Sequence, residues 1–196
     1  MLGSAIAQSG HRRTVGTVHL KGQKVYGLPG VPAKVLEAAG AGVVAAPAAR
    51  SFEIISGKTV DAFVGYSVSD ADGLKTLSYA TDVTDIDGHL SAPSFVLFMN
   101  KKRWQGLPQA DRDAIQRLGG EAFAQSMAVY DDLEAKARAA AASKGLKFHQ
   151  ADAAFMKDLR AMAEPLTKAW LADAAKAGVN GPEALDFFVS QAKANK

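Results

Sequence analysis

The chain has 196 residues, of which 48% are hydrophobic and 22% charged, a composition typical of a folded globular protein and not of a disordered one. The formal net charge is +3, and the basic residues form only short clusters, which argues against a nucleic-acid partner. There is no cysteine, so disulfides, thiolate metal sites and thiol nucleophiles are excluded.

The N-terminus bears on where the protein acts. No apolar run approaches the roughly 20 residues that span a bilayer. The opening sequence MLGSAIAQSGHRR lacks the basic start and the long apolar core of a signal peptide. The absence of cysteine is compatible with export, so two expectations stay open. Either the chain is not exported as written, or its true beginning lies upstream.

The first half of the chain alternates between strand-forming and helix-forming stretches. Strands are expected at 24–28, 42–47 and 59–67, and helices at 31–39 and 49–56. This alternation predicts an α/β fold with a parallel sheet and right-handed crossovers. Ligands of such sheets lie beyond the carboxyl ends of the strands. We therefore expect one rim to be lined by residues 26–28, 46–47 and 65–67.

The middle of the chain predicts an unusually long helix. A loop-rich stretch with one strand, Leu77–Thr81, leads to a fully apolar strand at 93–100 that we expect to be buried on both faces. From 109 to 144 only the pair Gly119-Gly120 interrupts the helical pattern, and the apolar stripe changes face partway. This pattern fits one strut between two lobes, and it fits equally well two helices split at the glycines.

The last part of the chain is predicted to be mostly helical. After a short strand at 146–149, a helix carries an apolar stripe that we expect to pack in the core and to be kinked by Pro165. A final helix begins at Gly181-Pro182 and is expected to bury Leu185 and Phe188. The stripe of the first helix consists of Phe155, Leu159, Met162, Leu166 and Trp170.

Motifs of catalysis and of metal or phosphate binding are weak. The sequence SGKT at 56–59 lacks the earlier glycine and the strand-to-helix context of a phosphate-binding loop. The sequence DADG at 70–73 lacks chelating residues at the ends of a calcium loop. The four histidines show no metal-ligand spacing, so we expect no metal and no cofactor. Three aspartates near His89 could form a small polar cluster: Asp82, Asp85 and Asp87.

Three segments in order resemble the solute-binding proteins of tripartite ATP-independent periplasmic (TRAP) transporters, of the dicarboxylate-binding type. The segments are LKGQKVYGLPG, TVDAFVGY and SAPSFVLFMNKKRWQGLPQADRDAI. The residues that match the family pattern are Leu20, Lys21, Gly22, Lys24, Val60, Asp61, Asn100, Lys101, Trp104, Leu107 and Pro108.

The resemblance implies a periplasmic-binding-protein-like, type II-like fold with two α/β lobes and a long helix across both. Residues 15–91 would form the ligand-binding second lobe, residues 92–131 would belong to the first lobe, and 132–196 would return to the second. Family members carry roughly 100 more N-terminal residues, so we expect the first lobe to be largely absent. Apolar surface should then be exposed around Phe95, Leu97 and Met99 unless another chain covers it.

The resemblance also implies a site. The arginine with which family members hold a ligand carboxylate falls on Tyr26, and their amide position falls on Gly65 or Tyr66. A phenol bonds a carboxylate less strongly than a guanidinium does, so Tyr26 and Phe63 favour an aromatic or partly apolar ligand. Arg50 could replace the missing arginine, or it could simply face solvent. The expected ligand-binding residues are Tyr26, Gly27, Arg50, Phe63, Gly65, Tyr66 and His89.

By this resemblance the chain is expected to be no enzyme. It would capture a small organic acid in the periplasm and deliver it to the TRAP membrane permease. Self-association through the uncovered first-lobe surface is a further expectation. Two alternatives stay open: a small α/β enzyme that uses Tyr26 and the His89 cluster on an organic acid, and a relic that binds nothing.

Overall fold

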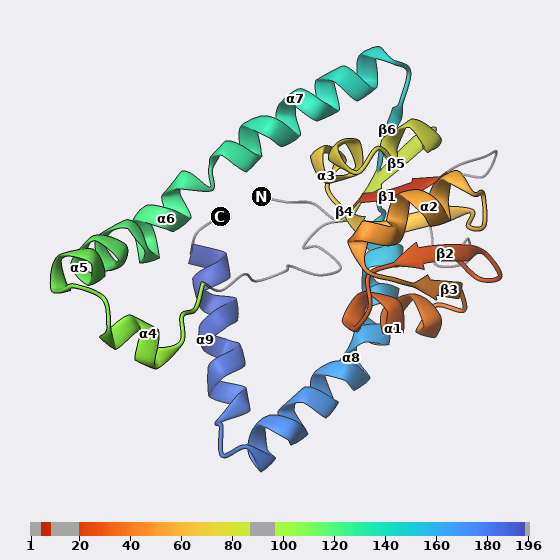
Figure 1. Cartoon of the computed structure of the whole chain (residues 1–196). Coiled ribbons are helices and arrows are strands. Elements are labelled where there is room, and N and C mark those ends of the chain that lie inside the picture. The colour runs from red at the N-terminus through yellow and green to blue at the C-terminus, as the bar shows by residue number, and fades with distance from the viewer. Residues whose placement is uncertain (1–4, 9–19, 87–96, 195–196) are drawn as a thin grey trace.

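The computed structural model describes residues 5–8, 20–86 and 97–194 (Figure 1). Its centre is a six-stranded sheet of order β3-β2-β4-β1-β5-β6. The strands are β1 (Ala5–Gln8), β2 (Lys24–Gly27), β3 (Gly42–Ala45), β4 (Ala62–Tyr66), β5 (Asp82–Asp85) and β6 (Lys147–Gln150).

The sheet is mainly parallel, as the alternation of strands and helices predicts. Strand β2 pairs in parallel with β3 on one side and with β4 on the other, and β5 pairs in parallel with β6. Strand β1 lies antiparallel between β4 and β5. The carboxyl ends of β2, β3 and β4 therefore meet at one edge of the sheet.

Two apolar clusters cover the two faces of the sheet. On one face Val25 and Val64 pack with helix α1 (Val31–Ala38) and the start of helix α8 (Ala153–Lys176). On the other face Tyr26 and Phe63 pack with helix α2 (Ser51–Ser56) and helix α3 (Val68–Gly73). Neighbouring strand residues point to opposite faces, so each buried strand contributes to both clusters.

The stretch from 109 to 144 forms an extended but interrupted rod. It contains α5 (Gln109–Leu118), α6 (Gly120–Ser126) and α7 (Val129–Ser143). Gly119 has an extended backbone and Gly120 a φ of +61°, and together they separate α5 from α6. Figure 1 shows α6 and α7 running nearly in line away from the sheet. Of the two alternatives that the sequence left open, the structure shows the split at the glycine pair, and a further interruption at 127–128 follows it, so the rod is not one continuous helix.

One expected strand lies a few residues further along the chain. Residues Leu77–Tyr79 form a 3₁₀ turn (η3) instead of the start of a strand, and the strand β5 follows it. The buried Thr76 donates a hydrogen bond from its hydroxyl to the carbonyl of Ala71, which ties this turn to the end of α3. The prediction of a strand at Leu77–Thr81 is therefore wrong.

The expected apolar strand at 93–100 is also wrong in its described part. Residues 97–100 have no regular structure and pair with no strand of the described chain. Leu97 is 91% exposed, Phe98 is exposed to a similar degree and Met99 is half exposed. Residues 93–96, including Phe95, lie outside the described residues. The next helix is α4 (Lys101–Gln105), capped by the side chain of Asn100.

The C-terminal helices are only partly packed. Helix α8 continues through Pro165, and Phe155 and Leu159 are in the core as expected, but Trp170 is 46% exposed. Helix α9 (Gly181–Ala194) packs against α8. Phe188 on α9 is 65% exposed, so the expectation that it is buried is wrong, while Leu185 is partly buried. In Figure 1 the second half of α8 extends away from the strands of the sheet.

Candidate ligand rim

Strand pairing brings most of the expected site residues together at the carboxyl edge of the sheet. Tyr26 lies directly beside Phe63, and Gly27 lies beside Val64 on β4 and Ala45 on β3. Gly65 and Tyr66 follow at the end of β4. The rim consists of these ends of β2, β3 and β4.

The centre of the rim is a pair of tyrosines. The hydroxyls of Tyr26 and Tyr66 are 2.7 Å apart, and the Tyr26 hydroxyl lies 2.8 Å from the carbonyl oxygen of Ala46. The two rings are stacked, with centroids 6.0 Å apart. Tyr26 is fully buried and Tyr66 is 5% exposed, so Tyr66 is the outer member of the pair. Burial, and then the hydrogen bond with Tyr66, raise the pKa of Tyr26 well above its ordinary value, so the Tyr26 phenol is neutral at physiological pH.

The two glycines of the rim have different reasons to be glycine. A Cβ on Gly27 would lie 3.1 Å from the Cδ1 atom of Leu36, so this glycine lets α1 approach β2 closely. Gly65 has a φ of +103°, in the region that favours glycine, and its nearest side chain is Leu28. Phe63 is buried in the core beside Tyr26.

The other two expected site residues do not join the tyrosine pair. Arg50 is largely exposed and forms a 3.4 Å ion pair with Glu53, three residues further along. A positive charge at the start of a helix is unfavourable because of the helix dipole, and the carboxylate of Glu53 offsets this effect. His89 lies outside the described residues, as does Asp87.

The aspartates expected around His89 have other partners. Asp82 lies 2.7 Å from Nε2 of His149 on β6, and this hydrogen bond lowers the pKa of Asp82. Asp85 accepts two hydrogen bonds from the guanidinium of Arg138 on α7, at 2.8 and 2.5 Å. Both aspartates therefore pair with residues of β6 and α7, which the sequence analysis did not place in the cluster around His89.

Sequence reasoning missed a partly buried ionic network beside the start of α3, which we call the α7 latch. It consists of Glu134, Arg138 and Asp85. The carboxylate of Glu134 accepts hydrogen bonds from the amides of Val68 and Ser69, at 3.2 and 2.8 Å, and from Nε of Arg138 at 2.7 Å. The latch therefore ties the rod helix α7 to the segment that directly follows Tyr66.

The charges of the latch stabilise one another. Burial of Glu134 raises its pKa, but the hydrogen bonds from Ser69 and Arg138 outweigh burial, so the pKa is lowered overall. The bonds to Asp85, followed by those to Glu134, raise the pKa of Arg138 despite its partial burial. The Glu–Arg spacing of four residues was a signal for this pair, although it is usually found on solvated helix faces.

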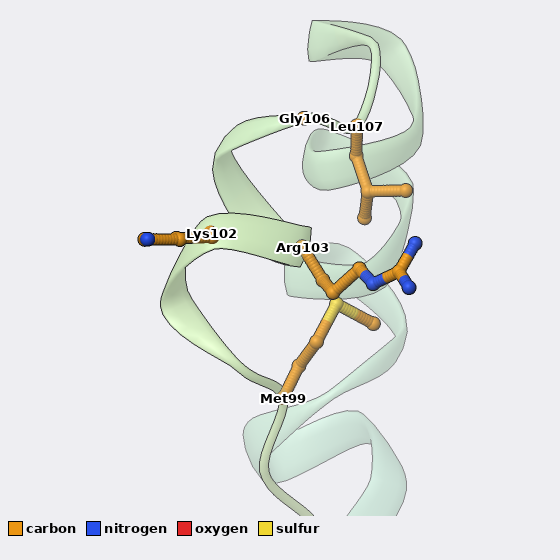
Figure 2. Close-up of a pocket in the computed structure, with 5 residues that line it drawn as sticks. All are labelled: Met99, Lys102, Arg103, Gly106 and Leu107. Carbon is orange, nitrogen blue, oxygen red and sulfur yellow. The ribbon is translucent and has the colours of Figure 1, made fainter.

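A pocket lies away from the rim, on the segment that contains α4 (Figure 2). Its volume is about 550 Å³ and it is lined by Met99, Lys102, Arg103, Gly106 and Leu107. In Figure 2 the side chains of Met99, Arg103 and Leu107 gather on one side of the segment, while Lys102 points away. None of these residues was expected in the site.

The described residues were also searched for metal sites and membrane spans. Within residues 5–8, 20–86 and 97–194, no three acidic or histidine side chains gather closely enough to hold a metal ion. Among the helices of the same residues, none combines the length and the hydropathy needed to cross a bilayer.

Comparison with known proteins identifies relatives of one kind. Residues 10–173 match the family model described as bacterial extracellular solute-binding protein, family 7. A protein of Comamonas testosteroni called outer membrane transporter protein TsaT is 66% identical over 181 residues, which are 92% of this chain and 54% of that protein. The chain thus spans about half the length of this curated relative.

Solved structures show the same fold. A TRAP periplasmic solute-binding protein from Bordetella bronchiseptica, solved with bound (R)- and (S)-mandelate, matches with a TM-score of 0.84 and 25% identity, over all of this chain and 62% of that one. A TRAP solute-binding protein from Rhodoferax ferrireducens, in complex with benzoate, matches with a TM-score of 0.77 and 20% identity, over 94% of this chain and 58% of that one.

The resemblance inferred from the three ordered segments is thereby confirmed. The family model and the matching solved structures are of solute-binding proteins, and the family is not one of enzymes. The chain belongs to the bacterial extracellular solute-binding proteins of family 7, the solute-binding proteins of TRAP transporters.

Proposed function

We propose that the chain is the part of a periplasmic TRAP solute-binding protein that holds an aromatic carboxylate and delivers it to the membrane permease. The observation that carries this proposal is the stacked, hydrogen-bonded pair Tyr26–Tyr66 at the rim. Two phenols stand where the family resemblance leads us to expect an arginine and an amide. A mandelate-bound relative with the same fold supports an aromatic ligand.

The energetics of the rim favour one carboxylate over two. A charge-assisted bond from an arginine contributes about 1.5–3 kcal/mol, whereas a neutral phenol contributes about 1 kcal/mol. A dicarboxylate would bring a second charge to the rim, and Arg50 is the single cation that we assign to it. An aromatic ring instead brings apolar surface without a second charge.

Arg50 is our candidate to bind the ligand carboxylate. Its present partner, Glu53, is an exposed neighbour at 3.4 Å, and such surface pairs contribute at most about 1 kcal/mol. A ligand carboxylate could therefore compete for this guanidinium at small cost. With Gly27, Gly65 and the two tyrosines, Arg50 completes the proposed site, and His89 keeps its place in it as a prediction from sequence.

Isothermal titration calorimetry tests the proposal. We expect saturable binding of benzoate or mandelate without turnover, and roughly tenfold weaker binding of succinate. Arg50→Gln should weaken the binding of every acid in the panel, whereas Arg117→Gln, on the exposed face of α5, is the matched control and should leave it unchanged.

The two alternative functions predict other outcomes of the same titration. Chemical conversion of a bound acid would favour the small α/β enzyme. An absence of binding by the whole panel would favour the relic. Either outcome would overturn the proposed function.

Exposed apolar side chains outside the sheet lead to a second proposal about partners. Leu97, Phe98, Leu118 and Phe123 are all at least half exposed. Several exposed large apolar side chains of this kind are typical of a surface that contacts another polypeptide. More than a third of the length of each relative lies outside the matched part, and a second copy of this chain could cover the same surface by self-association.

A further inference from the structure

The hydrogen bonds of the tyrosine pair have a fixed direction. The carbonyl oxygen of Ala46 carries no proton, so the Tyr26 hydroxyl must donate the 2.8 Å bond between them. A phenol has one proton, which leaves the Tyr26 oxygen as an acceptor. Tyr66 must then donate the 2.7 Å bond that joins the two hydroxyls. The chain of donation runs from Tyr66 to Tyr26 to Ala46.

This direction leaves Tyr66 with acceptor capacity alone. Its single proton is engaged, whereas its oxygen can still accept a hydrogen bond. Among the described residues, no side chain or backbone amide donates to that oxygen. Tyr66 is the last residue of β4, at the rim, and it is slightly exposed, whereas Tyr26 is fully buried.

We propose that Tyr66 determines ligand specificity by accepting a hydrogen bond from a hydroxyl group of the ligand, so that the rim selects hydroxylated aromatic acids over their unhydroxylated counterparts. This inference rests on the proposed function. It goes further than the proposed function because it pairs a hydrogen-bond donor of the ligand with one protein atom, the hydroxyl oxygen of Tyr66.

The same arrangement disfavours a carboxylate at Tyr66. A carboxylate oxygen also only accepts, so two acceptors would face each other unless Tyr66 gave up its bond to Tyr26. That change would leave the fully buried oxygen of Tyr26 without its donor, which is costly in the interior. The ligand carboxylate must therefore bind elsewhere, and Arg50 supplies a cation outside the pair.

Matched ligand pairs test the assignment in the full chain. Dissociation constants are measured for mandelate against phenylacetate and for 3-hydroxybenzoate against benzoate. The wild type should bind the hydroxylated member about fivefold more tightly in at least one pair, the effect of one neutral hydrogen bond. Tyr66→Phe should reduce that ratio to about one by weakening only the hydroxylated acid.

A second variant reverses the polarity of the site. In Tyr26→Phe the proton of Tyr66 loses its acceptor and becomes free for the ligand. This variant should bind benzoylformate, whose keto oxygen accepts, more tightly relative to mandelate than the wild type does, by a factor of about five. Circular dichroism and a melting curve establish that each variant is folded.

The outcomes separate this inference from the proposed function. Equal binding of both members of both pairs by the wild type would overturn the role of Tyr66 while leaving an aromatic acid-binding protein. A hydroxyl preference that persists unchanged in Tyr66→Phe would do the same. If no acid of the panel binds the wild type, the proposed function and this inference are both overturned.

Discussion

The sheet and the outer helices of this molecule use similar apolar residues in opposite ways. Val25, Leu36 and Val83 in and beside the sheet are fully buried. Leu118 on α5, Phe123 on α6 and the phenylalanines of α9 are more than half exposed. The sheet and its flanking helices thus form a self-sufficient core, whereas the outer helices present apolar surface without a covering partner in the described chain.

Two matched alanine substitutions test this comparison, and one of them should have the largest effect on the free energy of unfolding. Leu36→Ala should lower the free energy of unfolding by about 3 kcal/mol, because it opens a cavity between α1 and the sheet. The matched change Leu118→Ala, at an exposed site, should alter it by less than about 0.5 kcal/mol. Urea unfolding measures both. Equal losses would mean that α5 is packed in solution and that the contrast between the two regions is wrong.

The α7 latch connects the two regions, and its removal should have the next largest effect. Glu134→Ala leaves the amides of Val68 and Ser69 and the guanidinium of Arg138 without their acceptor, which should cost about 2 kcal/mol of unfolding free energy. Glu121→Ala, an exposed acid on α6, is the control and should cost little. A Glu134→Ala variant as stable as the control would show that α7 is held by other contacts.

Acidification should weaken the latch and the Asp82–His149 pair by a smaller amount. The pKa values of Glu134 and Asp82 are lowered in the folded protein, so their contribution to stability is fully present above their ordinary values near 4.5 and 3.8. This contribution to stability is lost as the pH falls through the lowered pKa values, because the two carboxylates then take up protons and lose the charge that their partners stabilise. Unfolding measured between pH 6 and pH 3 should show this decline. Glu134→Gln should make the decline shallower, and an unchanged slope would count against the latch.

Replacing exposed apolar side chains should have the smallest effect on stability but a clear effect on dye binding. The exposed side chains Leu97, Phe98 and Phe123 should bind a hydrophobic fluorescent dye in the native protein. Replacing Phe98 and Phe123 by serine should reduce the fluorescence while changing the free energy of unfolding by less than about 0.5 kcal/mol. A monomer that binds no dye would contradict the exposed surface.

The contrast between the regions also explains what the sequence could and could not predict. Strands β2, β3 and β4 were predicted within a few residues because β-branched residues alternate with clear glycine and proline breaks. Their parallel order then placed Tyr26 and Tyr66 side by side. The side-chain pattern at 93–100 and on α9 predicted burial, and it failed for Phe98 and Phe188 because apolar sequence indicates a need for a partner and not its presence.

Long-range polar pairs were beyond sequence reasoning for another reason. Asp82 and Asp85 pair with His149 and Arg138, which are more than fifty residues away in the chain. Only the pairing of β5 with β6 and the path of α7 bring these groups together. The sequence indicated that the aspartates were close to one another, and it could not specify which cations would meet them.

The central claim is that the edge formed by β2, β3 and β4 is where an aromatic acid binds. NMR chemical-shift perturbation on the labelled chain, titrated with mandelate, tests it most directly. The account predicts that the largest shifts cluster on Tyr26, Gly27, Gly65 and Tyr66, with smaller ones at Arg50. Shifts that centre instead on the pocket at Met99, Arg103 and Leu107, or no shifts at all, would contradict it.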